Sequence, residues 1–304
     1  MFRAGNKKPL TARLKDFKTA NSIDSKLATA STIAEYGGAD GLYLGAAATL
    51  EVACLHAEPA TAKQVELFVS AGILAQRAIN VAQTARVIGS SALRADQLRR
   101  DIPMLLPIYS EGILPQIEQV LANHKATLAS VKLAQGARKA AHTSGRIDTE
   151  KDINGYMSEL AVRLLLSRYA VNEIGDGSWL PIAAHLTSDR ATTRSTMDRS
   201  QSFDLGVLTQ TNPDLPIDEP YKIQVKTWHN LGPNKEGKQI EYADDIIVVT
   251  PTQISERYEK NPSFQRVLLE LQAEDAGMKV GASHLSDPCT ILDRRANLLI
   301  NHMG

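Results

Sequence analysis

Two stretches of alternating apolar and polar residues lie close together in the chain, and they constrain its fold more than any other feature. The first is Ser202–Leu208 and the second is Tyr221–Trp228. Alternation of this kind is typical of half-buried β-strands, whose successive side chains point to opposite faces. If the two strands pair, Asp204 of the first shares a face with Gln224 and Lys226 of the second. We therefore expect a carboxylate, an amide carbonyl and an ammonium group to converge there.

The residues before this pair of strands predict helices. Residues 22–141 are rich in alanine and follow helical spacing, with glycines and prolines between the segments. One apolar stripe is expected to face the core, and it consists of Val65, Phe68, Val69, Gly72, Ile73, Gln76, Ile79 and Ala82. The basic residues 1–20 are expected to form a loosely ordered arm. The segment Pro103–Pro115, interrupted by prolines, is expected to be a connector or a short helix.

A polar segment around residue 145 predicts a domain boundary. It separates a helical module with a basic N-terminal arm, residues 1–145, from an α/β domain, residues 146–304. The second part is expected to begin with a helix over residues 153–169. Further strands are predicted over residues 179–186 and 246–250, and a helix over residues 262–276.

Composition excludes several classes of protein. Cys54 and Cys289 are the only cysteines, so neither a disulfide framework nor a zinc motif is expected, and a reducing compartment is the default. No uncharged run reaches the length of about 20 residues that crosses a bilayer, and no signal peptide is recognisable. We expect a cytoplasmic protein without a membrane partner. Phosphate-binding, dinucleotide-binding, zinc-protease and serine-hydrolase motifs are all absent from the sequence.

The two strands also resemble a known family. The order helix, three strands, a further strand and a helix is similar to the core of the PD-(D/E)XK nuclease superfamily. Asp204 resembles the metal-binding aspartate of that family, and Gln224-Val225-Lys226 resembles its E-x-K half-motif in the Q-x-K form of Mrr-like restriction endonucleases. Glu159 lies on the preceding predicted helix, where many members carry another acid. The resemblance covers residues 153–250, about a third of the chain.

This resemblance implies a fold and an activity. The fold would be a restriction-endonuclease-like α/β domain with a central mixed sheet flanked by helices, following the N-terminal all-helical module. The activity would be metal-dependent hydrolysis of phosphodiester bonds by an endodeoxyribonuclease, in restriction, defence, repair or recombination. Many relatives act as dimers, so a homodimer is expected.

The chemistry of the residues agrees with this activity. A hard divalent cation, Mg²⁺ or Mn²⁺, stabilises charge on phosphate oxygens and prefers oxygen ligands. Asp204 and Gln224 would hold it with help from Glu159, and Lys226 would act on the attacking water. Because glutamine offers only a neutral carbonyl, it is a weaker ligand than glutamate.

Other interpretations remain open. Glu159 and Arg163 are four residues apart and could instead form a surface ion pair. A Ser/Thr-rich loop carries Arg190, Arg194 and Arg199, which either contact nucleic-acid phosphates or lie on an ordinary surface loop. The substrate could be RNA rather than DNA. The alternative to an enzyme is a non-catalytic nucleic-acid-binding or assembly protein built on a decayed nuclease core.

Overall fold

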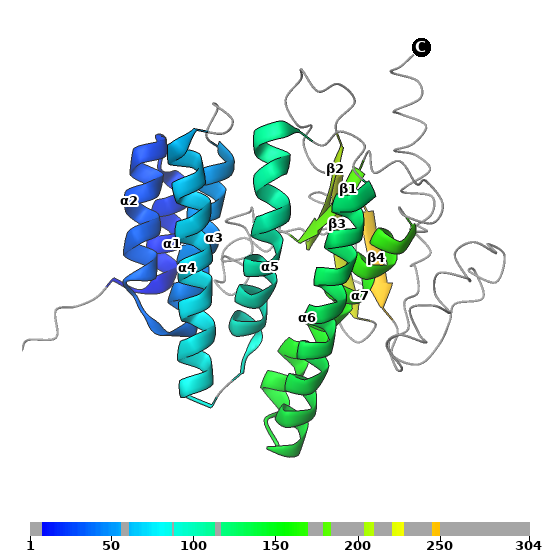
Figure 1. Ribbon diagram of the computed structural model, residues 1–304. Coiled ribbons are helices and arrows are strands. Elements are labelled where there is room, and N and C mark those ends of the chain that lie inside the picture. The colour runs from blue at the N-terminus through cyan, green and yellow to red at the C-terminus, as the bar shows by residue number, and fades with distance from the viewer. Residues whose placement is uncertain are drawn as a thin grey trace, which may run out of the picture. The chain divides into compact units, whose positions relative to one another are not determined.

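The chain forms two compact units, the first from residues 1–110 and 185–199 and the second from residues 111–184 and 200–304. The computed structural model describes residues 8–55, 61–86, 88–112, 117–169, 179–183, 204–209, 221–227 and 245–249. These residues form seven α-helices followed by four β-strands (Figure 1). The first unit contains the N-terminal helices, and the second contains the last two helices and the sheet.

The first unit is helical throughout its described residues. Its helices are α1 (Leu10–Thr19), α2 (Ile23–Ala34), α3 (Gly38–Leu55), α4 (Ala62–Thr84) and α5 (Ser90–Glu111). Hydroxyl side chains cap two of the helix starts: Ser22 Oγ accepts from the Ser25 backbone N–H at 3.1 Å, and Thr61 Oγ1 accepts from that of Gln64 at 3.2 Å. Such caps satisfy backbone donors that have no partner inside the helix.

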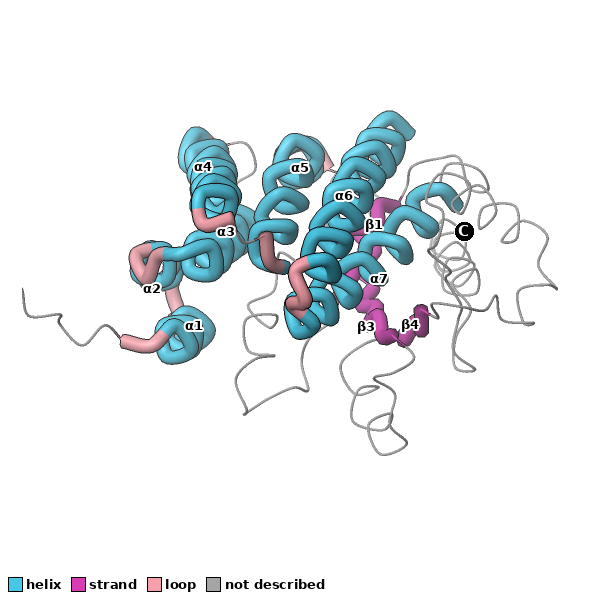
Figure 2. Tube along the Cα trace, turned by 90° about the horizontal axis from the view of Figure 1, so that it is seen from below, coloured by secondary structure: helices cyan, strands magenta, loops and turns pink. Residues whose placement is uncertain are grey.

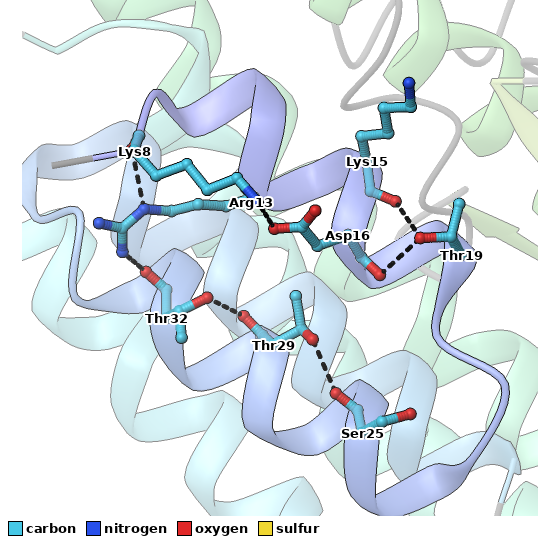
Figure 3. A network of polar contacts seen from close by, with 8 residues as sticks. All are labelled: Lys8, Arg13, Lys15, Asp16, Thr19, Ser25, Thr29 and Thr32. Atoms are coloured by element: carbon cyan, nitrogen blue, oxygen red, sulfur yellow. Dashed lines mark hydrogen bonds and ion pairs between the residues drawn. The ribbon is translucent and has the colours of Figure 1, made fainter.

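Helix α1 contradicts the expectation of a loose arm over residues 1–20, at least for the residues the structure describes. Leu14 and Phe17 bury their side chains, and this burial is what orders the segment. Arg13 joins α1 to α2, because its guanidinium donates to the Thr32 carbonyl as well as to the Lys8 carbonyl (Figure 3). The Lys26 ammonium lies 4.5 Å from the centre of the Phe17 ring. The basic residues that suggested a flexible arm thus include one that holds the helix in place.

Helices α3 and α4 pack through small side chains. Ala71, Ala75, Ala78 and Ala82 of α4 are all buried, and we call this row the alanine seam. Their spacing of four, three and four residues keeps them on one side of the helix. Because alanine projects so little from the backbone, the seam allows α4 to lie close to its neighbour.

The prediction that one apolar stripe of α4 faces the core is therefore wrong in part. Phe68 and Ala82 are buried as expected, but Val65, Val69 and Ile73 are exposed, by 38%, 54% and 56%. Helix α4 has apolar residues on two sides, and periodicity alone does not show which side is covered. The side with the smaller residues is the one that packs inside the unit.

Helix α5 contains two prolines, Pro103 and Pro107, in a segment predicted to be a connector or a short helix. The helical alternative holds for the described residues, but they form part of a helix of 22 residues rather than a short one. Each proline removes one helical hydrogen bond and favours a kink. Burial of Met104, Leu105 and Ile108 opposes this cost, since each side chain removes apolar area from water.

The second unit begins with a helical hairpin. Its elements are α6 (Ile117–Thr143), α7 (Ile147–Tyr169), β1 (Trp179–Ala183), β2 (Leu205–Thr209), β3 (Tyr221–Thr227) and β4 (Asp245–Val249). Gly145 joins the two helices with a φ of 69°, a conformation that glycine adopts without strain. The Arg146 N–H donates to the Ala141 carbonyl at 3.0 Å, so the turn satisfies the end of α6. The predicted domain boundary at residue 145 falls in this turn, inside the second unit.

The strands form one sheet in the order β1–β2–β3–β4. Strands β1, β2 and β3 are antiparallel neighbours, and β4 is parallel to β3. Helix α7 packs against β1, β3 and β4, and α6 packs against β1 at the sheet edge. Figure 2 shows α6 and α7 running past the strands.

This arrangement corrects the predicted fold class. We expected a restriction-endonuclease-like α/β domain with a central mixed sheet flanked by helices. The part of the chain that the structure describes is instead predominantly helical, with helices of up to 27 residues against strands of five to seven residues. Within it, the sheet has one helical layer, the α6–α7 pair. Strand alternation indicated where strands form, but it carries no information on which layers cover them.

A buried polar network joins α6, α7 and β1. Arg163 is 1% exposed, its Nη2 donates to Asn123 Oδ1, and its Nε donates to the Pro181 carbonyl at 3.2 Å. Asn123 Nδ2 donates to the same carbonyl at 2.9 Å and to Ser167 Oγ at 2.8 Å. Ser167 Oγ in turn donates to the Arg163 carbonyl at 2.9 Å. The network therefore attaches the edge strand to both helices.

Removal of Asn123 tests this network. We expect Asn123→Ala to lower the free energy of unfolding of the second unit by about 2–3 kcal/mol, because a buried guanidinium loses its acceptor. Trp179 and Trp228, the only tryptophans, both belong to the second unit, so their fluorescence during urea unfolding reports on it. Lys125 on the same helix is exposed, and Lys125→Ala should change the free energy of unfolding by less than about 0.5 kcal/mol. Equal effects of the two substitutions would contradict the role of the network.

Gly45 on α3 provides a second test. A Cβ atom added there would lie 2.6 Å from the Ala34 Cβ and 2.9 Å from its Cα, too close for any real contact. We expect Gly45→Ala to lower the free energy of unfolding by about 1–2 kcal/mol, measured by thermal unfolding followed by circular dichroism. Gly136 on α6 is exposed and has nothing within 4 Å of an added Cβ. Gly136→Ala should therefore raise stability by about 0.5–1 kcal/mol, as an unhindered glycine replacement does in a helix.

Candidate functional site

Asp204 stands at the start of β2 and is bonded directly to β3. Its backbone N–H donates to the Ile223 carbonyl at 2.9 Å. Its carboxylate Oδ2 accepts a hydrogen bond from the Val225 N–H at 2.8 Å. A side-chain oxygen thus takes the place of a backbone carbonyl in the β2–β3 ladder, and this fixes the carboxylate against β3.

The register of the two strands places Asp204 beside the Q-x-K residues. Leu205 pairs with Ile223 and Gly206 with Lys222 in the antiparallel ladder. One step further along the ladder, position 204 lies opposite position 224. Residues opposite one another on neighbouring strands share a face, and position 226 is two residues beyond 224 on that face. The backbone therefore brings the predicted positions 204, 224 and 226 together. The side chains of Gln224 and Lys226 lie outside the described part of the structure.

The surroundings of Asp204 are more enclosed than the alternating pattern predicts. Leu205 and Val207 are buried as expected, but Gly206 and Leu208, on the same face as Asp204, are buried too. Strand β2 is an interior strand, and burial on both faces suits that position. Asp204 itself is half-buried at the N-terminal end of β2, so a ligand would approach from that end of the strand.

Glu159 lies on α7, the helix that packs against β1, β3 and β4. It is half-buried between the buried residues Ser158 and Leu160. The alternative that Glu159 and Arg163 pair on the surface is wrong about the surface, because Arg163 is buried. Its guanidinium donates to Asn123 Oδ1 and to the Pro181 carbonyl. Helix α7, which carries Glu159, thus packs on β1 and β3, the two neighbours of the strand that follows Asp204.

The described residues contain a limited set of metal ligands. Among them, no three His, Cys, Asp or Glu side chains are grouped closely enough to hold an ion. Asp204 supplies a carboxylate, and one of its oxygens accepts from the Val225 N–H. Mg²⁺ keeps several water ligands, so one or two protein oxygens suffice. The donor chemistry of Asp204 together with Gln224 therefore fits a hard divalent cation.

Several predicted residues fall outside the described part of the chain. These are the loop arginines Arg190, Arg194 and Arg199, and the predicted helix over residues 262–276. The loop arginines stay a prediction for phosphate contacts.

Sequence reasoning missed the buried network of Arg163, Asn123 and Ser167. A signal for it was present, since Arg163 lies beside Leu164 and three residues after Leu160, on the apolar side of α7. A charged residue among core positions indicates a buried polar contact rather than a solvated one. The partner residue on α6 could not be read from the sequence.

Comparison of the chain with protein-family models, with curated proteins and with solved structures found no match. The assignment of a function therefore depends on the residues themselves.

Two substitutions separate the structural role of Asp204 from its charge. We expect Asp204→Ala to lower the free energy of unfolding by about 1–2 kcal/mol, because the Val225 N–H loses a charged acceptor. Asp204→Asn keeps a side-chain carbonyl in the same place and should cost less than half as much. Tryptophan fluorescence during urea unfolding measures both. Equal losses in the two variants would show that charge, rather than the acceptor, holds β2 to β3.

Proposed function

We propose that the protein is a metal-dependent endonuclease that hydrolyses phosphodiester bonds in DNA. The observation that carries this proposal is the hydrogen bond between the Asp204 carboxylate and the Val225 N–H, the central residue of Gln224-Val225-Lys226. It holds an acid against the strand that carries the amide and the ammonium group. The resemblance of these residues to the PD-(D/E)XK motif supports the same chemistry.

Each residue has a distinct role in this proposal. Asp204 and the Gln224 carbonyl would hold Mg²⁺ or Mn²⁺, with Glu159 adding negative charge from α7. The ion supplies charge stabilisation at the phosphate and lowers the pKa of a bound water. Lys226 orients the attacking water and stabilises the charge that develops on the phosphate oxygens. Arg190, Arg194 and Arg199 would contact the nucleic-acid backbone.

A second candidate function is non-catalytic binding of nucleic acid. The observation that favours it is that Asp204 Oδ2 already serves a structural purpose in the sheet. Gln224 is also a neutral ligand where a catalytic site of this kind commonly has an acid. A protein with this site would recognise nucleic acid without cutting it.

Cleavage of supercoiled plasmid in the presence of Mg²⁺ tests the enzyme. We expect Asp204→Asn and Lys226→Ala each to reduce the cleavage rate by on the order of 10²-fold or more, the size of effect that loss of one catalytic group has. Asp204→Asn is chosen because it keeps the acceptor for Val225. Asp148 of α7 and Lys139 of α6 are exposed. Asp148→Asn and Lys139→Ala are therefore the matched controls, and we expect them to leave the cleavage rate unchanged. Full activity of both site variants would place the chemistry elsewhere.

The same assay distinguishes the roles of Gln224 and the alternatives. Gln224→Glu should keep or increase metal-dependent cleavage, since a carboxylate is the stronger ligand; loss of cleavage would mean that Gln224 is not a ligand. Titration calorimetry with Mn²⁺ decides between enzyme and binder, because only the enzyme requires uptake that depends on Asp204. Parallel assays with matched DNA and RNA duplexes identify the substrate.

A further inference from the structure

Helix α4 exposes a side that has apolar residues and no charge along its middle. We call this the outer face of α4, and it consists of Val65, Val69, Ile73, Gln76 and Asn80. Val69 and Ile73, at its centre, are each more than half exposed. The two amides bond to each other, with Gln76 Nε2 donating to Asn80 Oδ1 at 2.9 Å. The face is opposite in character to an ordinary solvated helix side, which carries charged residues.

Helix α4 is the one described helix that is long and apolar enough to cross a membrane, judged by length and composition alone. Only 33% of its most apolar stretch is buried inside the protein. Contiguous exposed apolar surface of this kind marks an interaction site.

We propose that the outer face of α4 binds the outer face of a second copy of this chain, with the two α4 helices antiparallel about a two-fold axis. The charges beside the face identify this partner. Glu66 and Arg77 are eleven residues apart, about three helical turns, and so flank the face on the same side. An axis between residues 71 and 72 brings Glu66 of each copy opposite Arg77 of the other.

The same axis also matches the apolar residues. Val69 and Ile73 lie on either side of it within one helical turn, so Val69 of one copy packs beside Ile73 of the other. Two-fold symmetry then repeats every contact, which is how isologous interfaces form. Glu66 already pairs with Lys63 at 3.1 Å, but its side chain stays 64% exposed and can accept from an arginine as well. A parallel pair would instead place the two copies of Glu66 at the same height on opposite sides of the interface, where neither meets an Arg77.

A lipid surface suits this face less well. Helices that lie on membranes carry lysine and arginine along their polar side, whereas this face is bordered by one acid and one base. Crossing a membrane would also require α4 to leave α3, against which it packs. The dimer does not depend on the chemistry at Asp204, and a failure of one proposal leaves the other unaffected.

Sedimentation velocity over a range of concentrations tests the dimer. We expect the full-length chain to dimerise and Ile73→Lys to be monomeric, since a buried ammonium without a partner opposes association. Ile147→Lys is the matched control, because Ile147 is 65% exposed on α7 of the other unit, and it should dimerise like the unchanged protein. A chain that stays monomeric, or a dimer that survives Ile73→Lys, overturns the proposal. So does flotation of the monomer with anionic phospholipid vesicles that Ile73→Lys abolishes.

Charge exchange tests the antiparallel register. Glu66→Arg and Arg77→Glu should each weaken the homodimer roughly tenfold, as two flanking attractions become repulsions. An equimolar mixture of the two variants should regain the original affinity, because unlike charges then face each other again across the interface. The double variant should regain it too. A mixture no tighter than the single variants overturns the antiparallel pairing.

Discussion

The packing of the sheet against the helices of the second unit depends on the hydrogen bonds that the Pro181 carbonyl accepts. Strand β1 is the edge of the sheet, and a proline there suits the edge because it has no N–H to pair. Its carbonyl accepts from both Arg163 and Asn123, so the hydrogen bonds of the sheet continue into α6 and α7. Transfer of a guanidinium out of water is costly, and only good hydrogen bonds offset that cost. These side chains therefore determine which face of α7 packs toward the strands.

A similar substitution of side chain for backbone occurs at the other side of β2. The Asp204 carboxylate extends the ladder to β3 at the residue just before β2 begins. This bond serves both proposed functions, because it positions the acid against the strand that carries Gln224 and Lys226. In an enzyme, the same bond would limit how far the carboxylate can move when an ion binds. Positioning of this kind is what catalytic groups require from the elements that hold them.

The sequence of this chain predicted which strands are neighbours better than it predicted which side of a helix is buried. The alternation around Asp204 and Gln224 correctly indicated two neighbouring strands with these positions opposite one another, because the period of a strand is set by local geometry. The outcome differed for α4, where Val69 and Ile73 matched the helical period as well as the alanine seam did. Which of the two sides is covered depends on residues distant in sequence. The buried Arg163 could not be assigned for the same reason, since its acceptor Asn123 is forty residues away.

The alanine seam determines how the first unit responds to change. Alanine has no rotamers to lose on burial, so the seam orders the helices at little entropic cost. It also has no flexible atoms that could move aside for a larger neighbour. A bulkier residue at Ala75 or Ala78 would therefore have to displace α4 as a rigid rod away from α3. The helix consequently accepts large side chains on its outer face and only the smallest ones along the seam.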